Sequence, residues 1–193
     1  MKSSKKLKRI RERNFSAHHM LIRVASRANE RAKEHERGRV YEELTAMTFS
    51  ALAIEALCNS IGSRVFAEWD DFESSSPTAK LRLLADRLGI KYTKDKEPWA
   101  TALWLVKFRN LIAHAKPEVL VEEEVIDEED YDERLFDAPR SKFEKWITPQ
   151  HADRAVRGAK KIKDVLIGGM KPEDTLGLTT DGWSGSTRVH NDA

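Results

Sequence analysis

The sequence contains a single cysteine, Cys58, and this scarcity excludes an internal disulfide framework. Cys58 stands in the apolar segment 51–58, so we interpret it as a small core residue rather than a reactive thiol. The chain also lacks an uninterrupted apolar run long enough to span a bilayer, and its first residues lack the apolar stretch of a secretory signal. These absences predict a protein of the reducing cytoplasm with no membrane partner.

Sequence motifs for metals and cofactors are missing as well. There is no glycine-rich loop with the lysine and the serine or threonine that hold phosphates, and no paired-cysteine pattern for zinc. The acidic run at 122–133 lacks the alternation and the central glycine of a calcium-binding loop. We therefore predict no metal ion and no organic cofactor.

Charge is spread unevenly along the chain, although the formal net charge is only +2. Seven lysines and arginines crowd the first 14 residues, whereas residues 122–133 are densely acidic. Both segments are typical of solvated, partly disordered chain. The basic arm has a second interpretation, in which it holds RNA loosely through its phosphates.

Hydrophobic periodicity indicates a helical protein. The content of 34% charged and 40% hydrophobic residues suits a bundle whose helices each turn one apolar stripe inward. Apolar residues recur at three- and four-residue spacing, and glycines and prolines mark the ends of several of these segments. The expected helices are 15–37, 40–61, 77–89, 99–114 and 148–168. The predicted fold class is all-α, an up-and-down bundle of about five helices with a short irregular or β-like acidic insertion.

Composition also divides the chain into parts, and its length favours one main domain. The tail is rich in glycine, threonine and serine and leaves little to bury, so we expect it to be flexible. The parts are a basic arm at 1–14, a bundle at 15–168 with the insertion at 118–147, and the tail at 169–193.

The segment 99–114 is the most informative one, because it is apolar round nearly its whole circumference yet ends in Arg109, Asn110 and His114. Such polar groups are costly to bury without partners. On a helix, Asn110 and His114 lie four residues apart on one face, where the amide can hydrogen-bond the imidazole, and Arg109 projects from an adjoining face. The C-terminal end of a helix favours positive charge, so this cluster suits a phosphate.

Glu55 is a second polar residue in an apolar setting, and it needs a cation. Arg109 is the candidate for that cation. Glu55 then either supports the site or forms a buried ion pair that only fixes how two helices pack, in which case removal of one partner costs about 3–5 kcal/mol.

Residues 109–114, RNLIAH, resemble the Arg-Asn-x3-His motif of HEPN domains, which are small helical bundles that include many metal-independent ribonucleases. The resemblance covers roughly residues 41–117, because a long helix with ALAIEALCNSIG, a proline-led helix and a tryptophan-rich helix follow the family's order. A second copy with the same spacing, RNFSAH, lies at Arg13 to His18. We prefer the copy at Arg109 because it ends an apolar helix at the boundary that Pro117 forces.

The resemblance implies cleavage of single-stranded RNA, in which the neighbouring 2′-hydroxyl is the nucleophile. His114 is then the general acid or base, Arg109 stabilises the charge on the phosphate, and Asn110 and Glu55 support them. We expect five further cations to contact the RNA, namely Lys107, Lys116, Arg154, Arg157 and Lys161.

The resemblance also implies partners. Family members commonly form homodimers that bring two motifs to a shared cleft, and some act as toxins with a protein antitoxin or in phage defence. The apolar excess of segment 99–114 fits a dimer, although the same residues can instead form the core of a monomer. Some relatives carry a tyrosine, modified by the antitoxin, two positions after the histidine; Lys116 stands there in this chain, so this mode of control is not expected.

Two alternatives to a nuclease stay open. One is a non-catalytic interaction module of the same fold that binds a protein, a nucleotide or a nucleic acid. The other is a sequence-indifferent nucleic-acid binder that uses the basic arm and the basic face of the last helix.

Overall fold

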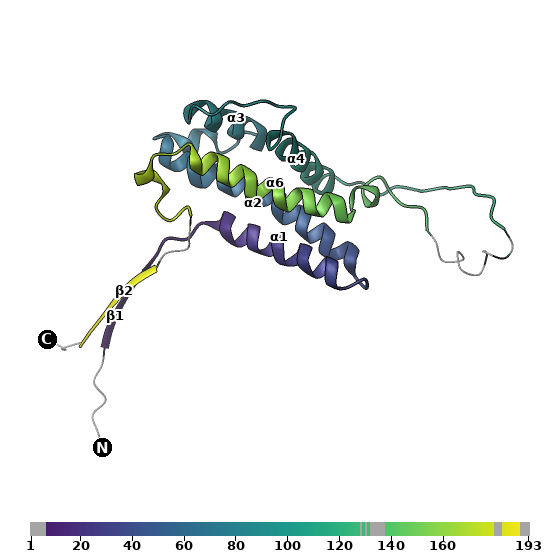
Figure 1. The fold of residues 1–193 in the computed structure, drawn as a ribbon, viewed down its shortest axis with the longest axis horizontal. Coiled ribbons are helices and arrows are strands. Elements are labelled where there is room, and N and C mark those ends of the chain that lie inside the picture. Colours follow the sequence, from purple (N-terminus) through teal and green to yellow (C-terminus); the bar gives the residue numbers. More distant parts are fainter. Residues whose placement is uncertain (1–6, 128, 130, 132–137, 180–182, 190–193) are drawn as a thin grey trace, which may run out of the picture.

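The chain forms a helical bundle in the computed structural model, which describes residues 7–127, 129, 131, 138–179 and 183–189. Within these residues five α-helices pack against one another, and a two-stranded ribbon projects from one end of the bundle (Figure 1). The predicted all-α fold class is confirmed. The helices are α1 (Ala17–Glu34), α2 (Arg39–Val65), α3 (Pro77–Arg87), α4 (Trp99–Ala113) and α6 (Pro149–Gly168), with 3₁₀ turns at Trp69–Phe72, Glu144–Trp146 and Pro172–Thr175.

Two helices begin at the residues that the sequence indicates. The Ser76 hydroxyl accepts the backbone N–H of Ala79 at 3.2 Å, and Pro77 occupies the first position of α3. The Thr148 hydroxyl accepts the backbone N–H of His151 at 3.1 Å, one residue before α6 begins. Each side chain satisfies an amide that has no partner within its helix, and this local bond fixes the start of the helix.

α2 is the central helix of the bundle and packs against α1, α3, α4 and α6. Its inward side chains, among them Met47, Ile54 and Leu57, are almost fully buried. Among the described helices α2 alone is long and apolar enough to cross a membrane, and half of that apolar window is buried inside the bundle. Such a composition is also typical of a helix at the centre of a bundle, and the absence of a membrane partner stays a prediction.

The sequence prediction that α2 ends before Gly62 is wrong, because the helix continues to Val65. Gly62 is the point where the indole of Trp69 packs against α2. A Cβ atom at Gly62 would lie 2.1 Å from the Trp69 ring, which real Cβ contacts do not show. The glycine therefore permits a close approach of the ring rather than ending the helix.

Contacts between side chains show that α6 runs antiparallel to both α1 and α4. Asp153, in the first turns of α6, accepts hydrogen bonds from Asn29 at 2.7 Å and Lys33 at 2.6 Å, near the end of α1. His151 lies against Trp104, whereas Arg154, further along α6, contacts the earlier residue Thr101. The C-terminal ends of α1 and α4 therefore lie near the start of α6.

The two ends of the chain pair with each other. Strand β1 (Leu7–Arg13) and strand β2 (Trp183–Val189) form an antiparallel ribbon in which Leu7 faces Val189 and Arg13 faces Trp183. Every described side chain of β1 is exposed. The sequence-based interpretation as arm and tail did not foresee this pairing, because the signal for it is divided between two segments more than 160 residues apart.

The part of the tail before β2 packs against the bundle. Leu178 is fully buried and Met170 is 8% exposed, so both belong to the core. The prediction of a tail with little to bury is wrong for this stretch. The prediction rested on the average composition of the tail, which gave no weight to two large apolar residues. A turn at Gly177, whose φ is 74°, directs Leu178 inward.

The acidic insertion leaves the bundle after α4. Residues 114–127 contain no helix or strand and run outward from the bundle (Figure 1). The predicted irregular insertion is therefore confirmed for this part, while residues 128, 130 and 132–137 of the segment lie outside the described residues. Val119, Val121 and Val125 are 82% or more exposed.

Candidate functional site

The predicted residues Arg109, Asn110 and His114 lie together at the C-terminal end of α4. Arg109 and Asn110 belong to the last turns of the helix, and His114 caps it, with its backbone N–H donating to the carbonyl of Asn110 at 3.1 Å. Arg109 is half-buried, whereas Asn110 and His114 are exposed. The cluster therefore lies at the surface, where a ligand from solution can reach it.

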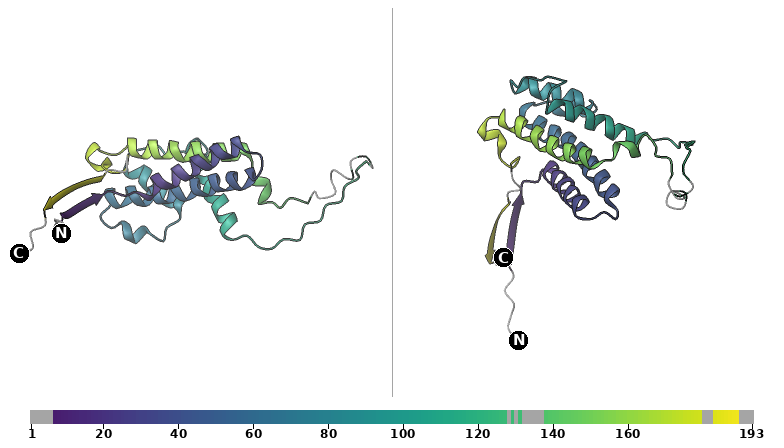
Figure 2. Two further views of the ribbon diagram at one scale, coloured as in Figure 1. Left: turned by 90° about the horizontal axis from the view of Figure 1, so that it is seen from below. Right: turned by 45° about the vertical axis from the view of Figure 1, so that its right-hand side comes forward.

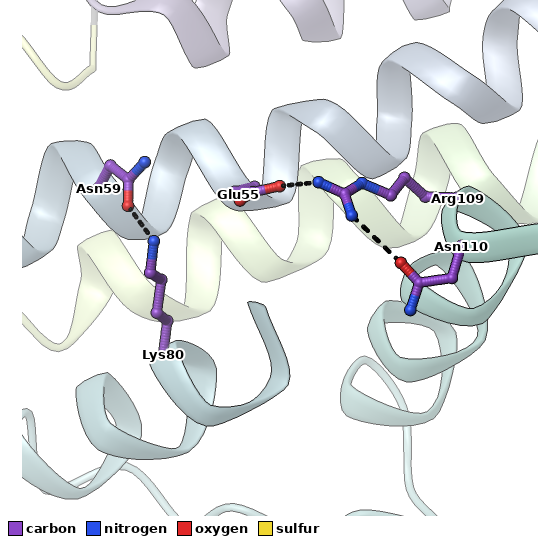
Figure 3. A network of polar contacts seen from close by, with 5 residues as sticks. All are labelled: Glu55, Asn59, Lys80, Arg109 and Asn110. Atoms are coloured by element: carbon purple, nitrogen blue, oxygen red, sulfur yellow. Dashed lines mark hydrogen bonds and ion pairs between the residues drawn. The ribbon is translucent and has the colours of Figure 1, made fainter. Parts of the chain in front are cut away.

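Glu55 of α2 and Arg109 of α4 form an ion pair, as the sequence predicts (Figure 3). Nη2 of Arg109 donates to Oε2 of Glu55 at 3.3 Å. The two side chains are 38% and 29% exposed, so water screens the pair. The cost expected for a fully buried ion pair does not apply here, and we assign the interaction about 1 kcal/mol at most.

Asn110 contacts Arg109 rather than His114. Nη1 of Arg109 donates to Oδ1 of Asn110 at 3.2 Å. No hydrogen bond joins Asn110 to the His114 imidazole in the part of the chain that the structure describes, which differs from the expected role of Asn110. The reason is that His114, with φ −119° and ψ 17°, has left the helical path, so the four-residue spacing no longer aligns the two side chains.

Lys80 and Asn59 extend the polar contacts along α2 (Figure 3). Nζ of Lys80 donates to Oδ1 of Asn59 at 2.9 Å, and Asn59 lies one turn after Glu55. Lys80 is only 1% exposed, which is rare for lysine. Sequence reasoning missed Lys80, although its spacing of four from Leu84 puts it on the buried stripe of α3 and so provided a signal.

Three of the five predicted RNA-contacting cations line one pocket. Arg154, Arg157 and Lys161 of α6 surround an open pocket of about 530 Å³ with the start of α4 on its other side. Lys107 lines a different pocket, of about 630 Å³, and Lys116 is an exposed residue beyond the end of α4. The five cations therefore do not form one surface.

Arg154 is held in place by its neighbours. Its Nε donates to Oγ1 of Thr101 at 2.9 Å, its Nη2 donates to Oε1 of Glu97 at 3.0 Å, and the guanidinium lies 5.2 Å from the centre of the Trp104 ring. Burial raises the pKa of Glu97, but hydrogen bonds from Thr101 and Arg154 outweigh this and lower the pKa on balance. The ionised Glu97 offsets the charge of Arg154, so this cation is already paired within the chain.

Aromatic side chains from the end of the insertion cover much of α4. The ring of Trp146 stacks on Trp104 with centroids 5.8 Å apart, and Phe143 stacks on Phe108 at 6.1 Å. Trp99 and Phe108 are buried within the chain itself. The apolar excess of α4 is therefore used largely in the monomer, and it is no longer an argument for a dimer.

The second motif copy has a structural role. His18 is fully buried in α1, where Nδ1 lies 3.3 Å from the Ser60 hydroxyl and Nε2 lies 3.2 Å from the Leu178 carbonyl oxygen. Arg13 of this copy is in β1, so one motif spans a strand, a connection and a helix start. A histidine enclosed in this way does not reach a substrate, which favours the copy at Arg109.

Two further expectations concern reactive groups. Cys58 is fully buried in the core, and burial raises the pKa of its thiol to about 12, so the thiol stays protonated and unreactive. No group of three or more His, Cys, Asp or Glu side chains within the described ranges is arranged to hold a metal ion. The predicted lack of a cofactor stays a prediction.

Comparison of the chain with models of known families, with curated proteins and with solved structures found no match.

Proposed function

We propose that this chain is a HEPN-like, metal-independent endoribonuclease that cuts single-stranded RNA in the cytoplasm. The observation that carries the proposal is the arrangement at the end of α4, where Glu55 and Asn110 hold the Arg109 guanidinium and the exposed residue His114 caps the same helix. A guanidinium held in this way suits the oxygens of a phosphate, and an imidazole suits proton transfer near neutral pH.

The proposed reaction is a transesterification within the RNA, and it asks the protein for proton transfer and charge stabilisation. The 2′-oxygen of the RNA forms a bond to phosphorus, and the bond between phosphorus and the 5′-oxygen breaks. A base takes the proton of the 2′-hydroxyl, and an acid gives a proton to the 5′-oxygen that leaves. Arg109 stabilises the charge that gathers on the phosphate oxygens, and the products are a cyclic phosphate and a 5′-hydroxyl.

The reaction moves two protons on opposite sides of the phosphate, and the motif supplies one histidine. Within one chain the described contacts of Arg109 lead to Glu55 and Asn110, not to His114. We therefore place the complete site between two copies of the chain, each of which contributes Arg109 and His114. A toxin or phage-defence setting, with a protein antitoxin as a further partner, belongs to the same proposal.

A second candidate is a non-catalytic interaction module, and one observation favours it. The guanidinium of Arg109 already has two partners within its own chain, which is also what a residue that fixes helix packing would show. In this case the polar end of α4 binds a protein or nucleotide without changing it.

The test compares cleavage of a single-stranded RNA by wild type, His114→Ala and Arg109→Ala. We expect both variants to lose at least about 10²-fold in rate. His35→Ala is the matched control, because His35 is also an exposed histidine that caps the C-terminal end of a helix, α1, and we expect it to retain full activity. A chelator should leave cleavage unchanged, and an RNA whose 2′-hydroxyls are replaced by hydrogen should resist it.

Two results would overturn the nuclease proposal. One is equal activity of His114→Ala and His35→Ala at equal melting temperature. The other is wild-type protein that cuts no RNA but binds a partner, with binding lost in Arg109→Ala; the interaction module then replaces the nuclease.

A further inference from the structure

The ribbon formed by β1 and β2 projects from the bundle (Figures 1 and 2). Its described side chains are exposed. Seven residues in each strand make it about 24 Å long. At the root of the ribbon the Arg13 guanidinium lies over the Phe15 ring, 5.1 Å from the ring centre. A two-stranded ribbon without a third strand or a packed face is only marginally stable in water. We therefore expect its exposed side chains to serve contact with a binding partner.

The root of the ribbon is fixed to the bundle on both of its strands. After β1, the Ser16 hydroxyl donates to the carbonyl oxygen of Gly177 at 3.0 Å. Before β2, Arg64 at the end of α2 donates to the carbonyl oxygens of Asp174 and Leu176 at 2.9 and 2.6 Å. These bonds hold the two chain segments together where they leave the bundle, so the ribbon has a defined origin.

The ribbon carries cations on both faces. It carries five cations and a single carboxylate, Glu12. Because side chains alternate along a strand, Arg9 and Arg11 share one face, whereas Lys8 lies on the other, directly opposite Arg188. Like charges in directly opposite positions destabilise a ribbon, and a bound anion would relieve this repulsion.

We propose that the ribbon binds the phosphate backbone of single-stranded nucleic acid without reading its sequence. Cations on both faces suit a flexible polyanion that can pass over either side, and the unpaired N–H groups at the strand edges add donors for phosphate oxygens. The remaining polar side chains between the cations are short hydroxyls at Ser184, Ser186 and Thr187. This binding does not depend on the proposed cleavage.

The alternative ligand of the ribbon is the acidic insertion of a second copy of the chain. The positions of the apolar residues argue against this alternative. Val119, Val121 and Val125 are exposed and would need an apolar strip to cover them. On β1, Leu7 and Ile10 lie on opposite faces, and Arg9 follows Leu7 on its face, so the apolar side chains of this strand do not line up as a strip. Along β1 the ribbon therefore offers charge but no apolar strip, which suits the phosphates of a nucleic acid better than the acidic insertion of a second copy.

The ribbon and the cluster at Arg109 lie at different positions along the bundle. The ribbon originates where α1 begins, and α4 ends near the start of α6, which runs antiparallel to α1. On α2, Glu55 of the cluster precedes Arg64 at the root of the ribbon by nine residues, which is about 14 Å of helix. The ribbon is therefore a separate contact, not a part of the candidate catalytic cluster.

The test measures binding of a fluorescent single-stranded DNA oligonucleotide, which has no 2′-hydroxyl and so separates binding from cleavage. Arg9→Gln with Arg11→Gln should weaken binding about tenfold at 0.1 M salt and reduce the slope of log affinity against log salt by about 1.4, because each lost phosphate contact contributes about 0.7. Arg23→Gln with Arg27→Gln, two exposed arginines on α1, is the control and should change neither. Arg9→Lys with Arg11→Lys should retain binding.

Three results overturn the proposal. The first is wild-type affinity and salt slope in the Arg9 and Arg11 glutamine variant. The second is an equal loss in the α1 control, which would mean that only net charge matters. The third is a variant that binds DNA normally but loses self-association in sedimentation, which would assign the ribbon to the second copy's acidic insertion. Binding without any RNA cleavage would leave the ribbon proposal standing and count against the nuclease alone.

Discussion

Nε2 of His18 lies 3.2 Å from the carbonyl oxygen of Leu178, 160 residues later in the chain. This contact joins the start of α1 to the segment after α6, and both residues are fully buried. Ser60 of α2 contacts the other ring nitrogen of His18 at 3.3 Å. The C-terminal segment is therefore part of the folded core up to at least Leu178.

The first prediction concerns this segment. Leu178→Ala should lower the free energy of unfolding by about 2–5 kcal/mol, because it removes a fully buried side chain and leaves a cavity. Leu176→Ala, two residues earlier and 74% exposed, is the matched control and should change stability by less than about 0.5 kcal/mol. Urea denaturation of both variants measures the difference, and equal effects would mean that the segment is not docked in solution.

The second prediction concerns Glu55 and Arg109. A double-mutant cycle with Glu55→Gln and Arg109→Gln should give a coupling of about 0.5–1 kcal/mol, because the pair is close but partly exposed. Glu55→Gln combined with Arg31→Gln, an arginine that pairs with Glu42 instead, should be additive. Denaturant unfolding measures each corner of the cycle. Additivity in the first cycle would remove the ion pair as the element that holds Arg109.

The third prediction concerns the pH dependence of stability at Asp153. The hydrogen bond from the Asn29 side chain, followed by that from Lys33, lowers the pKa of Asp153 below its unfolded value of about 4. A lowered folded-state pKa stabilises the protein above the unfolded pKa, and this contribution is lost as pH falls through the folded pKa. Asp153→Asn should therefore cost about 1 kcal/mol at pH 7, a value that allows for screening of this partly exposed group.

The difference in the free energy of unfolding between wild type and Asp153→Asn should shrink as the pH falls below about 4. Urea unfolding across a pH series measures it. Asp164→Asn, on the exposed side of the same helix, is the control and should change stability by less than about 0.5 kcal/mol at pH 7. If the loss of stability in Asp153→Asn stays constant at low pH, the carboxylate charge is not the cause of that loss.

Most of the correct predictions rest on residue patterns that are local in the sequence. The starts of α3 and α6 were predictable because Ser76 and Thr148 bond to amides three residues away. The pairing of Glu55 with Arg109 was predictable because each is a charge on an otherwise apolar helix and has few possible partners. The position of His114 beyond the end of α4 was not, since the last residue of a helix depends on how its end is capped.

The sequence by itself determined the helices and the polar residues at the end of α4, because helix periodicity and capping act over a few residues. Only the tertiary structure decided that Leu178 completes the core, that Lys80 is buried against Asn59, and that β1 pairs with β2. It also distinguished two motifs of identical spacing by burying His18 and exposing His114. These outcomes depend on contacts between distant segments, and such contacts form only where burial and hydrogen bonding repay the entropy of closing a long loop.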